Sequence, residues 1–509
     1  MIGVRAPAGA LLLCIVAWGC GEASPSSPID ASADADATLE ASVDARLDAP
    51  APDADASAPG PSVVWSHPLP FGTFSSPVIH TSGSRSLVLL GYGIEGTAGG
   101  AVAVDVQTGA EVWRIEAGQE MFALPRRLSG GSGELFVFAG RNGWLFAVDA
   151  ATGEKRWQFT PNGELGRAEG FYNFYTGLEI PDVNADGVAD YAVSNGGDNR
   201  AVSGTSRDPG HLLVLSGLDG TLLRKWSVPE AKETYVSLTR WPIAGSEDLV
   251  VFGTGGETIG GNLFSAPAAN LAGGACCAAA ELMGTRQVVA GGETRGFIPP
   301  PSYADLGADG SLQMFVAPFD GRLVALLSPE APLWTFTPPE AHETNASPAL
   351  GDFDGDGDLD VFHLAQRGVY PAWTGSSLWA FDATSGDQIW QAESRERLVI
   401  ASPLAVDVDG DGKDEILYAA SDPRYFFGEA GSTELRVAHV DEGRVETIAT
   451  LAGLTGGTGW VGDADGDSRL EWFVPMSQLG GGVLVRVDLA AAAPDSIAWG
   501  GYLGTDHGL

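Results

Sequence analysis

The chain has 509 residues, a formal net charge of −38 and an isoelectric point near 4.3. So acidic a surface excludes nucleic acid and anionic membrane surfaces as electrostatic partners and favours cations. The length exceeds that of an average single domain, which directs attention to internal repeats.

Residues 1–20 have the features of an export signal. Arg5 precedes an apolar run that is shorter than the roughly 20 residues needed to cross a bilayer. The segment ends in Ala17-Trp18-Gly19-Cys20, which resembles a bacterial lipobox, although Ala17 and Trp18 depart from its usual pattern. We expect lipidation of Cys20, with plain signal-peptidase cleavage as the alternative. Gly21 resembles the residue after the cysteine in Gram-negative lipoproteins exported to the outer membrane, where this lipid would be the only membrane contact.

Residues 21–61 consist almost wholly of Ala, Asp, Ser and Pro. They include nine acidic residues, one basic residue (Arg46) and no aromatic residue. Low hydrophobicity and like charge predict a disordered tether. Residues 62–509 are then the folded domain, facing either the periplasm or the cell surface.

A longer pattern repeats through residues 62–509. Its clearest copies, Gly143 to Trp157 and Ser377 to Trp390, contain an apolar strand, an Asp, a Thr-Gly or Ser-Gly turn and a Trp-bearing strand. Successive copies start on average about 55 residues apart, a spacing typical of propeller blades. The eight openings lie near Ser75, Ala123, Glu179, Val236, Ser302, Ser347, Ser402 and Thr458. The pattern predicts an all-β, eight-bladed β-propeller in which Val63 to Trp65 complete the last blade beside residues 482–489. The tryptophans are expected in the core.

Four blades carry one acidic loop each, in the first turn of blades three, six, seven and eight. Oxygen-bearing side chains at loop positions 1, 3, 5 and 9 and a backbone carbonyl at position 7 suit a calcium ion, which takes six to eight oxygens. These positions are Asp182, Asn184, Asp186, Val188 and Asp190; Asp352, Asp354, Asp356, Asp358 and Asp360; Asp407, Asp409, Asp411, Lys413 and Glu415; and Asp463, Asp465, Asp467, Arg469 and Glu471. We predict three to four structural Ca²⁺ sites.

The surroundings of these loops separate them from EF-hands. Apolar, β-prone runs follow each loop, where an EF-hand would have a helix and a Glu at position 12. Simple solvated turns remain the alternative. Glycine fills position 6 in three loops, whereas Ser468 there predicts a strained turn in the fourth. Blade five has a degenerate copy, Asp305 to Gln313, with too few acidic ligands.

The acidic loop followed by an apolar strand resembles the FG-GAP (VCBS-type) repeat, and the Trp-bearing unit resembles the PQQ-like propeller repeat. Quinoprotein dehydrogenases are also exported, calcium-dependent, eight-bladed propellers with a vicinal disulfide, and this chain has Cys276-Cys277. Those cysteines lie in an Ala/Gly-rich insertion without the Asp or Asn companions of that family. Rhamnogalacturonan-lyase-like enzymes are another calcium-rich propeller class. An exported enzyme of either kind is therefore the alternative to a binding module, and no residue is assigned as catalytic.

Aromatic residues gather in segments expected on the face opposite the acidic loops. They are Phe171, Tyr172, Tyr175, Trp373, Tyr425 and Phe426. Aromatic rings on an irregular face suit protein or sugar contacts; plugging the channel or covering blade edges is the alternative. The sequence thus favours an envelope-anchored, calcium-binding interaction module for a protein or a polysaccharide.

Overall fold

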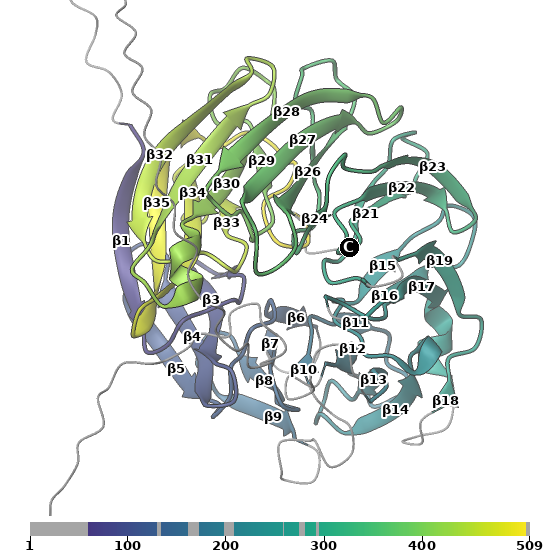
Figure 1. The fold of residues 1–509 in the computed structure, drawn as a ribbon. Coiled ribbons are helices and arrows are strands. Elements are labelled where there is room, and N and C mark those ends of the chain that lie inside the picture. Colours follow the sequence, from purple (N-terminus) through teal and green to yellow (C-terminus); the bar gives the residue numbers. More distant parts are fainter. Residues whose placement is uncertain are drawn as a thin grey trace, which may run out of the picture.

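The computed structural model describes residues 60–129, 134–160, 173–197, 208–257, 259–273, 280–291 and 295–504. The predicted signal, the tether, Cys20, the cysteine pair, Phe171 and Tyr172 lie outside these ranges, as does the side chain of Phe426. Eight sheets, antiparallel except for one short parallel pair in blade three, stand in a ring around a central axis (Figure 1). The predicted eight-bladed β-propeller is confirmed.

The first four blades contain the following strands, given from the axis outward. Blade one has β2 (Val78–Ser82), β3 (Arg85–Ile94), β4 (Ala98–Asp105) and β5 (Glu111–Glu116); blade two has β6 (Arg126–Leu128), β7 (Leu135–Ala139), β8 (Leu145–Asp149) and β9 (Lys155–Phe159); blade three has β10 (Asn173–Phe174) and β11 (Leu178–Ile180) beside β12 (Asp190–Gly196), then β13 (His211–Leu215), β14 (Leu222–Ser227) and β18 (Ala280–Glu281); and blade four has β15 (Thr239–Trp241), β16 (Leu249–Gly253), β17 (Asn262–Pro267) and β19 (Arg286–Ala290).

The other four blades follow the same order. Blade five has β20 (Ser302–Ala304), β21 (Gln313–Val316), β22 (Leu323–Ser328) and β23 (Ala331–Phe336); blade six has β24 (His342–Glu343) and β25 (Ala349–Gly351) beside β26 (Asp360–Arg367), then β27 (Gly375–Asp382) and β28 (Gln388–Arg395); blade seven has β29 (Leu404–Val406), β30 (Glu415–Ser421), β31 (Ser432–His439) and β32 (Arg444–Ala452); and blade eight has β33 (Trp460–Gly462), β34 (Arg469–Gln478), β35 (Gly481–Ala492) and β1 (Ser62–Leu69). Three 3₁₀ turns complete the described elements: η3 (Pro229–Ala231), η4 (Ala268–Ala272) and η5 (Pro423–Phe427).

The ring closes through its N-terminal strand. β1 pairs antiparallel with β35, with Ser62 opposite Asp488 and Leu69 opposite Gly482. This is the closure predicted from Val63 to Trp65. Pairing the two ends of the domain in one sheet covers the edge that β35 would otherwise expose.

Tryptophans join neighbouring blades and explain the Thr-Gly turn of the repeat. Trp113 of blade one is buried, and its Nε1 donates to the carbonyl of Ala150 in blade two at 2.8 Å. Its ring covers Gly153, where a Cβ atom would come within 2.6 Å of the indole. The same pairing joins Trp65 to Gly109, Trp157 to Gly220 and Trp334 to Gly386. Trp113 and Trp157 are buried in the core, as expected from the sequence, and the half-buried Trp65 and Trp334 pack against it.

Hydroxyl side chains at the blade openings form part of a belt around the axis. The amide of Ser347 donates to Ser402 Oγ at 3.0 Å, and the amide of Ser402 donates to Thr458 Oγ1 at 3.0 Å. The amide of Thr458 donates to Ser76 Oγ at 3.1 Å. The small residues that open each repeat therefore link blades six, seven, eight and one.

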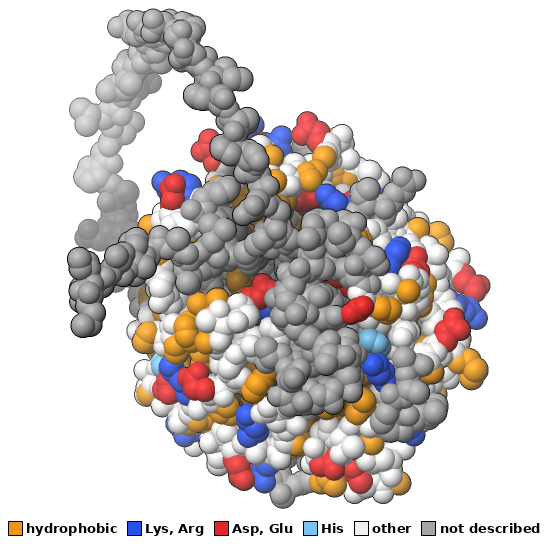
Figure 2. All heavy atoms as spheres, turned by 60° about the horizontal axis from the view of Figure 1, so that its bottom comes forward, with side chains coloured by type: hydrophobic (Ala, Val, Ile, Leu, Met, Phe, Trp, Pro, Cys, Tyr) orange, Lys and Arg blue, Asp and Glu red, His pale blue; other side chains and the backbone are white. Residues whose placement is uncertain are grey.

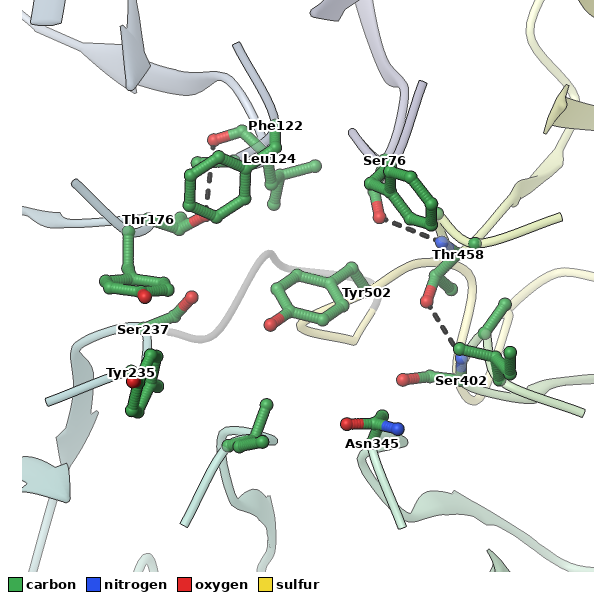
Figure 3. Close-up of a pocket in the computed structure, with 18 of the residues that line it drawn as sticks. Ser76, Phe122, Leu124, Thr176, Tyr235, Ser237, Asn345, Ser402, Thr458 and Tyr502 are labelled. Atoms are coloured by element: carbon green, nitrogen blue, oxygen red, sulfur yellow. Dashed lines mark hydrogen bonds between the residues drawn. The ribbon is translucent and has the colours of Figure 1, made fainter. Parts of the chain in front are cut away.

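The C-terminal segment returns to the axis. Trp499 exchanges two backbone hydrogen bonds with Ala405 of β29, and the carbonyl of Gly500 accepts from Val461 of β33. Tyr502 then lies in the centre of the ring, among residues from opposite blades (Figure 3). Neither sequence repeat accounts for this segment. Among the described residues, no helix is long and apolar enough to span a membrane.

Candidate functional site

The four acidic loops connect the first and second strands of their blades, as the sequence predicted. They lie between β11 and β12, β25 and β26, β29 and β30, and β33 and β34. Because every first strand runs in the same direction along the axis, the loops share one end of the ring. The degenerate loop of blade five lies between β20 and β21.

All four loops have the same backbone framework, which the loop of blade six illustrates. The amide of Gly357 donates to Asp352 at 3.0 Å, and the amide of Asp358 donates to Asp356 at 2.9 Å. The amide of Phe353 donates to the position 9 carboxylate of Asp360 at 2.8 Å. Equivalent bonds recur in the other three acidic loops and, through Gln313, in blade five. The spacing therefore encodes one loop conformation, acidic or not.

Position 6 has a positive φ in every acidic loop. The values are near +90° at Gly187, Gly357 and Gly412, and Ser468 adopts +67°. The strain predicted for Ser468 is therefore present in the backbone. Position 4 also takes a positive φ, including at Ala185, a requirement that sequence analysis did not notice.

The oxygen donors of three loops are gathered closely enough for one ion each. Carboxylate oxygens lie within 4.8 Å of one another in the groups Asp352, Asp354 and Asp356; Asp407, Asp409 and Asp411; and Asp463, Asp465, Asp467 and Glu471. In blade three, Asn184 Nδ2 and Ser216 Oγ both donate to Asp186. The donors are hard oxygens, which fit Ca²⁺.

The position 9 carboxylates are the buried carboxylates of these loops. Burial, reinforced by the neighbouring aspartates, raises the pKa of Asp360 to about 7, of Glu415 to about 8 and of Glu471 to about 7. Burial also raises the pKa of Asp190. A buried carboxylate among other carboxylates ionises readily only when a positive charge lies nearby. A bound cation would supply that charge.

Blade eight has its own positive charge, which sequence analysis missed. Arg486 of β35 is 4% exposed, and its Nη2 lies 2.9 Å from Asp465 Oδ2 and 3.3 Å from Glu471 Oε1. The same nitrogen lies 3.2 Å from Asp488 Oδ1. The guanidinium thus occupies the acidic cluster of the fourth loop. The sequence does not indicate this contact, because only the pairing of β34 with β35 brings Arg486 next to the acidic loop.

The opposite end of the ring holds an axial chamber of about 180 Å³, formed by the segments that precede the first strands (Figure 3). Aromatic rings of Phe74, Phe122, Tyr175, Tyr235 and Tyr502 line it, with hydroxyls of Ser76, Thr176, Ser237, Ser402 and Thr458. Asn345 also faces this space. Tyr502 brings the C-terminal segment into the chamber, so its lining combines rings and hydroxyls from most blades.

Charged side chains stand beside this chamber. Arg141, one of its lining residues, is buried, donates from Nε to Glu120 Oε2 at 2.5 Å and stacks 4.7 Å above the Phe122 ring. On the visible surface of Figure 2, basic side chains lie beside acidic ones instead of forming one patch. The net acidity is therefore not offset by a separate basic surface on this face.

The aromatic residues predicted for a ligand face have separate positions. Tyr175 is 7% exposed and lines the axial chamber. Trp373 donates from Nε1 to Glu343 at 2.9 Å, and Tyr425 is 1% exposed in a cluster with Leu398 and Leu454. Tyr425 therefore packs between the segments that lead into the first strands of blades seven and eight. Phe171, Tyr172 and the Phe426 side chain are not among the described residues.

The sequence also matches a known family over part of its length. Residues 97–270, from β4 in blade one to η4 after the third strand of blade four, match the family described as "Outer membrane protein assembly factor BamB". The repeats of this stretch are PQQ-like. No curated protein matches the chain. The PQQ-like match ends before the acidic loops of blades six to eight.

Solved structures resemble this propeller at low identity. BamB from Moraxella catarrhalis is 14% identical, with 84% of this chain and 99% of that chain covered at a TM-score of 0.48. Quinohemoprotein alcohol dehydrogenase ADHIIG from Pseudomonas putida HK5 is 10% identical over 85% of this chain and 77% of that chain, at a TM-score of 0.52. A europium-containing methanol dehydrogenase is 12% identical over 84% and 93%, at 0.53. The two dehydrogenases share the fold, and at these identities the likeness extends no further.

Proposed function

We propose that this chain is a cell-envelope binding module that engages a protein or polysaccharide ligand at its axial chamber. The chamber carries this proposal: five aromatic rings and several hydroxyls converge in a concave site at one end of the ring. Rings can cover the apolar face of a sugar or hold an aromatic side chain, while hydroxyls and the Asn345 amide orient the ligand. The chamber is small, so it suits one sugar unit or one side chain of a longer ligand.

Calcium ions at the acidic loops, which lie at the other end of the ring, would stabilise the fold that carries the chamber. Ion binding would neutralise carboxylates that otherwise repel one another and so add to the folding free energy. The PQQ-like match to the BamB family and the lipobox-like Cys20 both favour an envelope location, with a lipid anchor as the membrane contact. A chelator should lower the melting temperature markedly. An unchanged melting temperature would contradict a structural role for calcium.

Binding can be tested with chamber variants. Envelope polysaccharide fractions and envelope proteins are presented to the wild type and to Phe122→Ala, whose ring lines the chamber. We expect the variant to lose capture while keeping its melting temperature near that of the wild type. Leu479→Ser, an exposed apolar residue in the β34–β35 turn, is the control and should bind normally. Equal capture by Phe122→Ala and the wild type contradicts a chamber site.

A further inference from the structure

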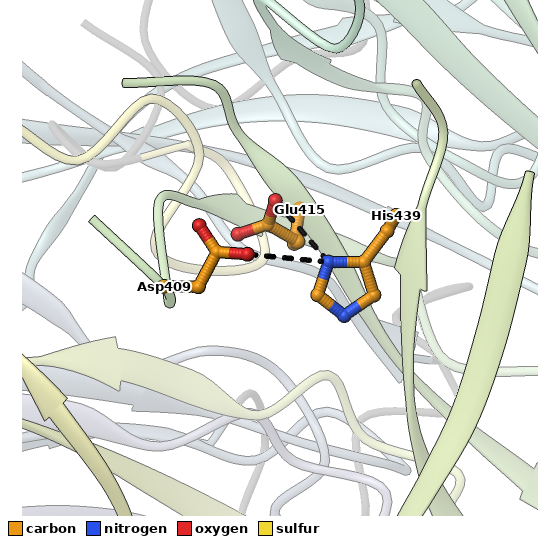
Figure 4. Close-up of side chains that lie close together, drawn as sticks. All are labelled: Asp409, Glu415 and His439. Atoms are coloured by element: carbon orange, nitrogen blue, oxygen red, sulfur yellow. Dashed lines mark ion pairs between the residues drawn. The ribbon is translucent and has the colours of Figure 1, made fainter. Parts of the chain in front are cut away.

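In blade seven a histidine side chain lies close to two carboxylates of the acidic loop (Figure 4). His439 Nδ1 lies 3.6 Å from Asp409 Oδ2 and 3.5 Å from Glu415 Oε1. The three donor atoms all lie within 4.8 Å of one another. His439 is 3% exposed and Glu415 is 2% exposed, so two of the three groups are shielded from water. One ring nitrogen thus faces two carboxylates, and such an arrangement needs a positive charge between them.

These separations match a metal centre. Zinc binds imidazole nitrogen and carboxylate oxygen at about 2.0–2.2 Å, which places neighbouring donors of a tetrahedral site roughly 3.4 Å apart. Both measured separations from Nδ1 are close to this value. Neither is short enough for a hydrogen bond between the imidazole and a carboxylate. The space between His439 Nδ1 and the two carboxylate oxygens is therefore of the size that a bound metal ion occupies.

The other ring nitrogen also faces a carboxylate. His439 Nε2 lies 3.5 Å from Glu446 Oε1 on β32. This separation is too long for a hydrogen bond, so Glu446 acts on the imidazole through its negative charge, which favours a cation bound at the ring. Glu446 belongs to neither the acidic loop nor its strands, so this contact is independent of the loop pattern.

The other blades show that the histidine is specific to blade seven. In the repeat, His439 stands where Asp149 and Asp382 stand, at the end of the third strand. Asp149 and Asp382 instead accept backbone amides of the following turn. In blade eight the corresponding cluster is filled by Arg486.

We propose that Asp409, Glu415 and His439 bind a transition-metal ion of the zinc class, so that blade seven takes this ion in place of calcium. Imidazole is a good ligand for Zn²⁺ and Co²⁺ and a poor one for Ca²⁺, which prefers oxygen. The site shares Asp409 and Glu415 with the acidic loop, so the proposal rests partly on the calcium loops of the proposed function. The proposal places a single ion at these carboxylates, so exchange is one for one.

Metal competition tests the proposal on the full chain. Calcium-loaded protein is titrated with ZnCl₂ while released Ca²⁺ is followed with an indicator, and Co²⁺ spectra of the chelator-stripped chain report the ligand field. We expect one Zn²⁺ to release one Ca²⁺ in the wild type and none in His439→Gln. Zinc affinity should fall at least tenfold in His439→Gln, which loses a ligand, and by a smaller factor in Glu446→Gln, which loses only a neighbouring negative charge.

The matched control is His80→Gln. His80 is also buried and lies 3.3 Å from Glu134, but in blade one, which has no acidic loop. It should release calcium as the wild type does. Equal zinc affinity in the wild type and His439→Gln overturns the proposal. If His439→Gln fails to fold, the exposed Glu446→Gln variant decides instead. If no calcium is bound at all, the proposed calcium sites fail separately, and zinc titration of the stripped chain still tests this site.

Discussion

At the scale of single residues, Arg486 separates the fourth acidic loop from the others. A guanidinium fixed beside Asp465 and Glu471 offers the positive charge that a cation would bring, and it is part of the chain. A buried pair of this kind becomes costly when one partner is removed, because the remaining charge stays buried. The loop of blade eight should therefore depend less on calcium than the loops of blades six and seven.

Replacing the guanidinium should reverse this dependence. We expect Arg486→Gln to destabilise the chelator-treated protein by about 3 kcal/mol, because Asp465 and Glu471 lose their counter-charge. Excess calcium should recover much of the loss. Denaturant midpoints with and without calcium measure both effects. The control is Arg469→Gln, which makes the same charge change at an exposed position of the same loop and should cost less than about 0.5 kcal/mol. Equal losses with and without calcium contradict this role.

The buried Glu415 predicts an unusual pH dependence. Its pKa rises from 4.5 to about 8 on folding without a metal, mainly through burial and then through the nearby aspartates. Between these values the folded chain holds a proton that the unfolded chain has released, so this contribution is complete below pH 4.5 and is lost as pH rises through 8. The chelator-treated protein should melt higher near about pH 6 than near about pH 8.5.

Calcium should reverse the sign of that pH effect, because protons and Ca²⁺ compete for the same carboxylates. Thermal melts at both pH values, in chelator and in calcium, make the comparison. In Glu415→Gln the pH effect in chelator should become smaller, since this residue no longer titrates. If the melting temperature of the wild type in chelator increased with pH, the raised pKa of Glu415 could not be the cause of the pH effect.

At the scale of elements, the turn between the third and fourth strands of one blade forms a socket, that is, the surface on which the tryptophan of the preceding blade packs. Gly153→Ala should lower stability by about 2–4 kcal/mol, combining positive-φ strain with a clash against Trp113. Gly83→Ala is the matched control: its φ is +63°, but a Cβ there meets nothing within 4 Å. It should lose only about 1 kcal/mol. Urea midpoints compare the two variants, and equal losses would rule out the socket.

The elements also show which parts of the structure the sequence could predict. The openings near Ser302, Ser402 and Thr458 lie within two residues of β20, β29 and β33, because a small residue, a turn and an apolar run repeat locally. The acidic loops follow from local spacing in the same way. His439 and Arg486 were missed because their approach to the loops depends on strand register. The parallel pairing of β18 with β14 and the position of Tyr502 on the axis depend on long-range packing, which no local pattern records.

At the scale of the whole molecule, the two ends of the domain depend on each other. β1 supplies the outer strand of blade eight, and Trp65 also donates to the carbonyl of Val106 at 2.9 Å in blade one. The strand thus closes a sheet and bridges the first and last blades. Backbone pairing and the tryptophan contact are separate contributions, and two variants can distinguish them.

Deleting Ser62–Leu69 should open the ring and leave the edge of β35 unpaired, which favours association with other chains. We expect this variant to melt lower and to form oligomers in size-exclusion chromatography with light scattering. Trp65→Ala keeps the backbone of the strand but loses its contacts with Gly109 and Val106, so it should melt lower and stay monomeric. Because only the deletion exposes β35, oligomers in both variants, or in neither, would show that the pairing of β1 is not what protects this edge.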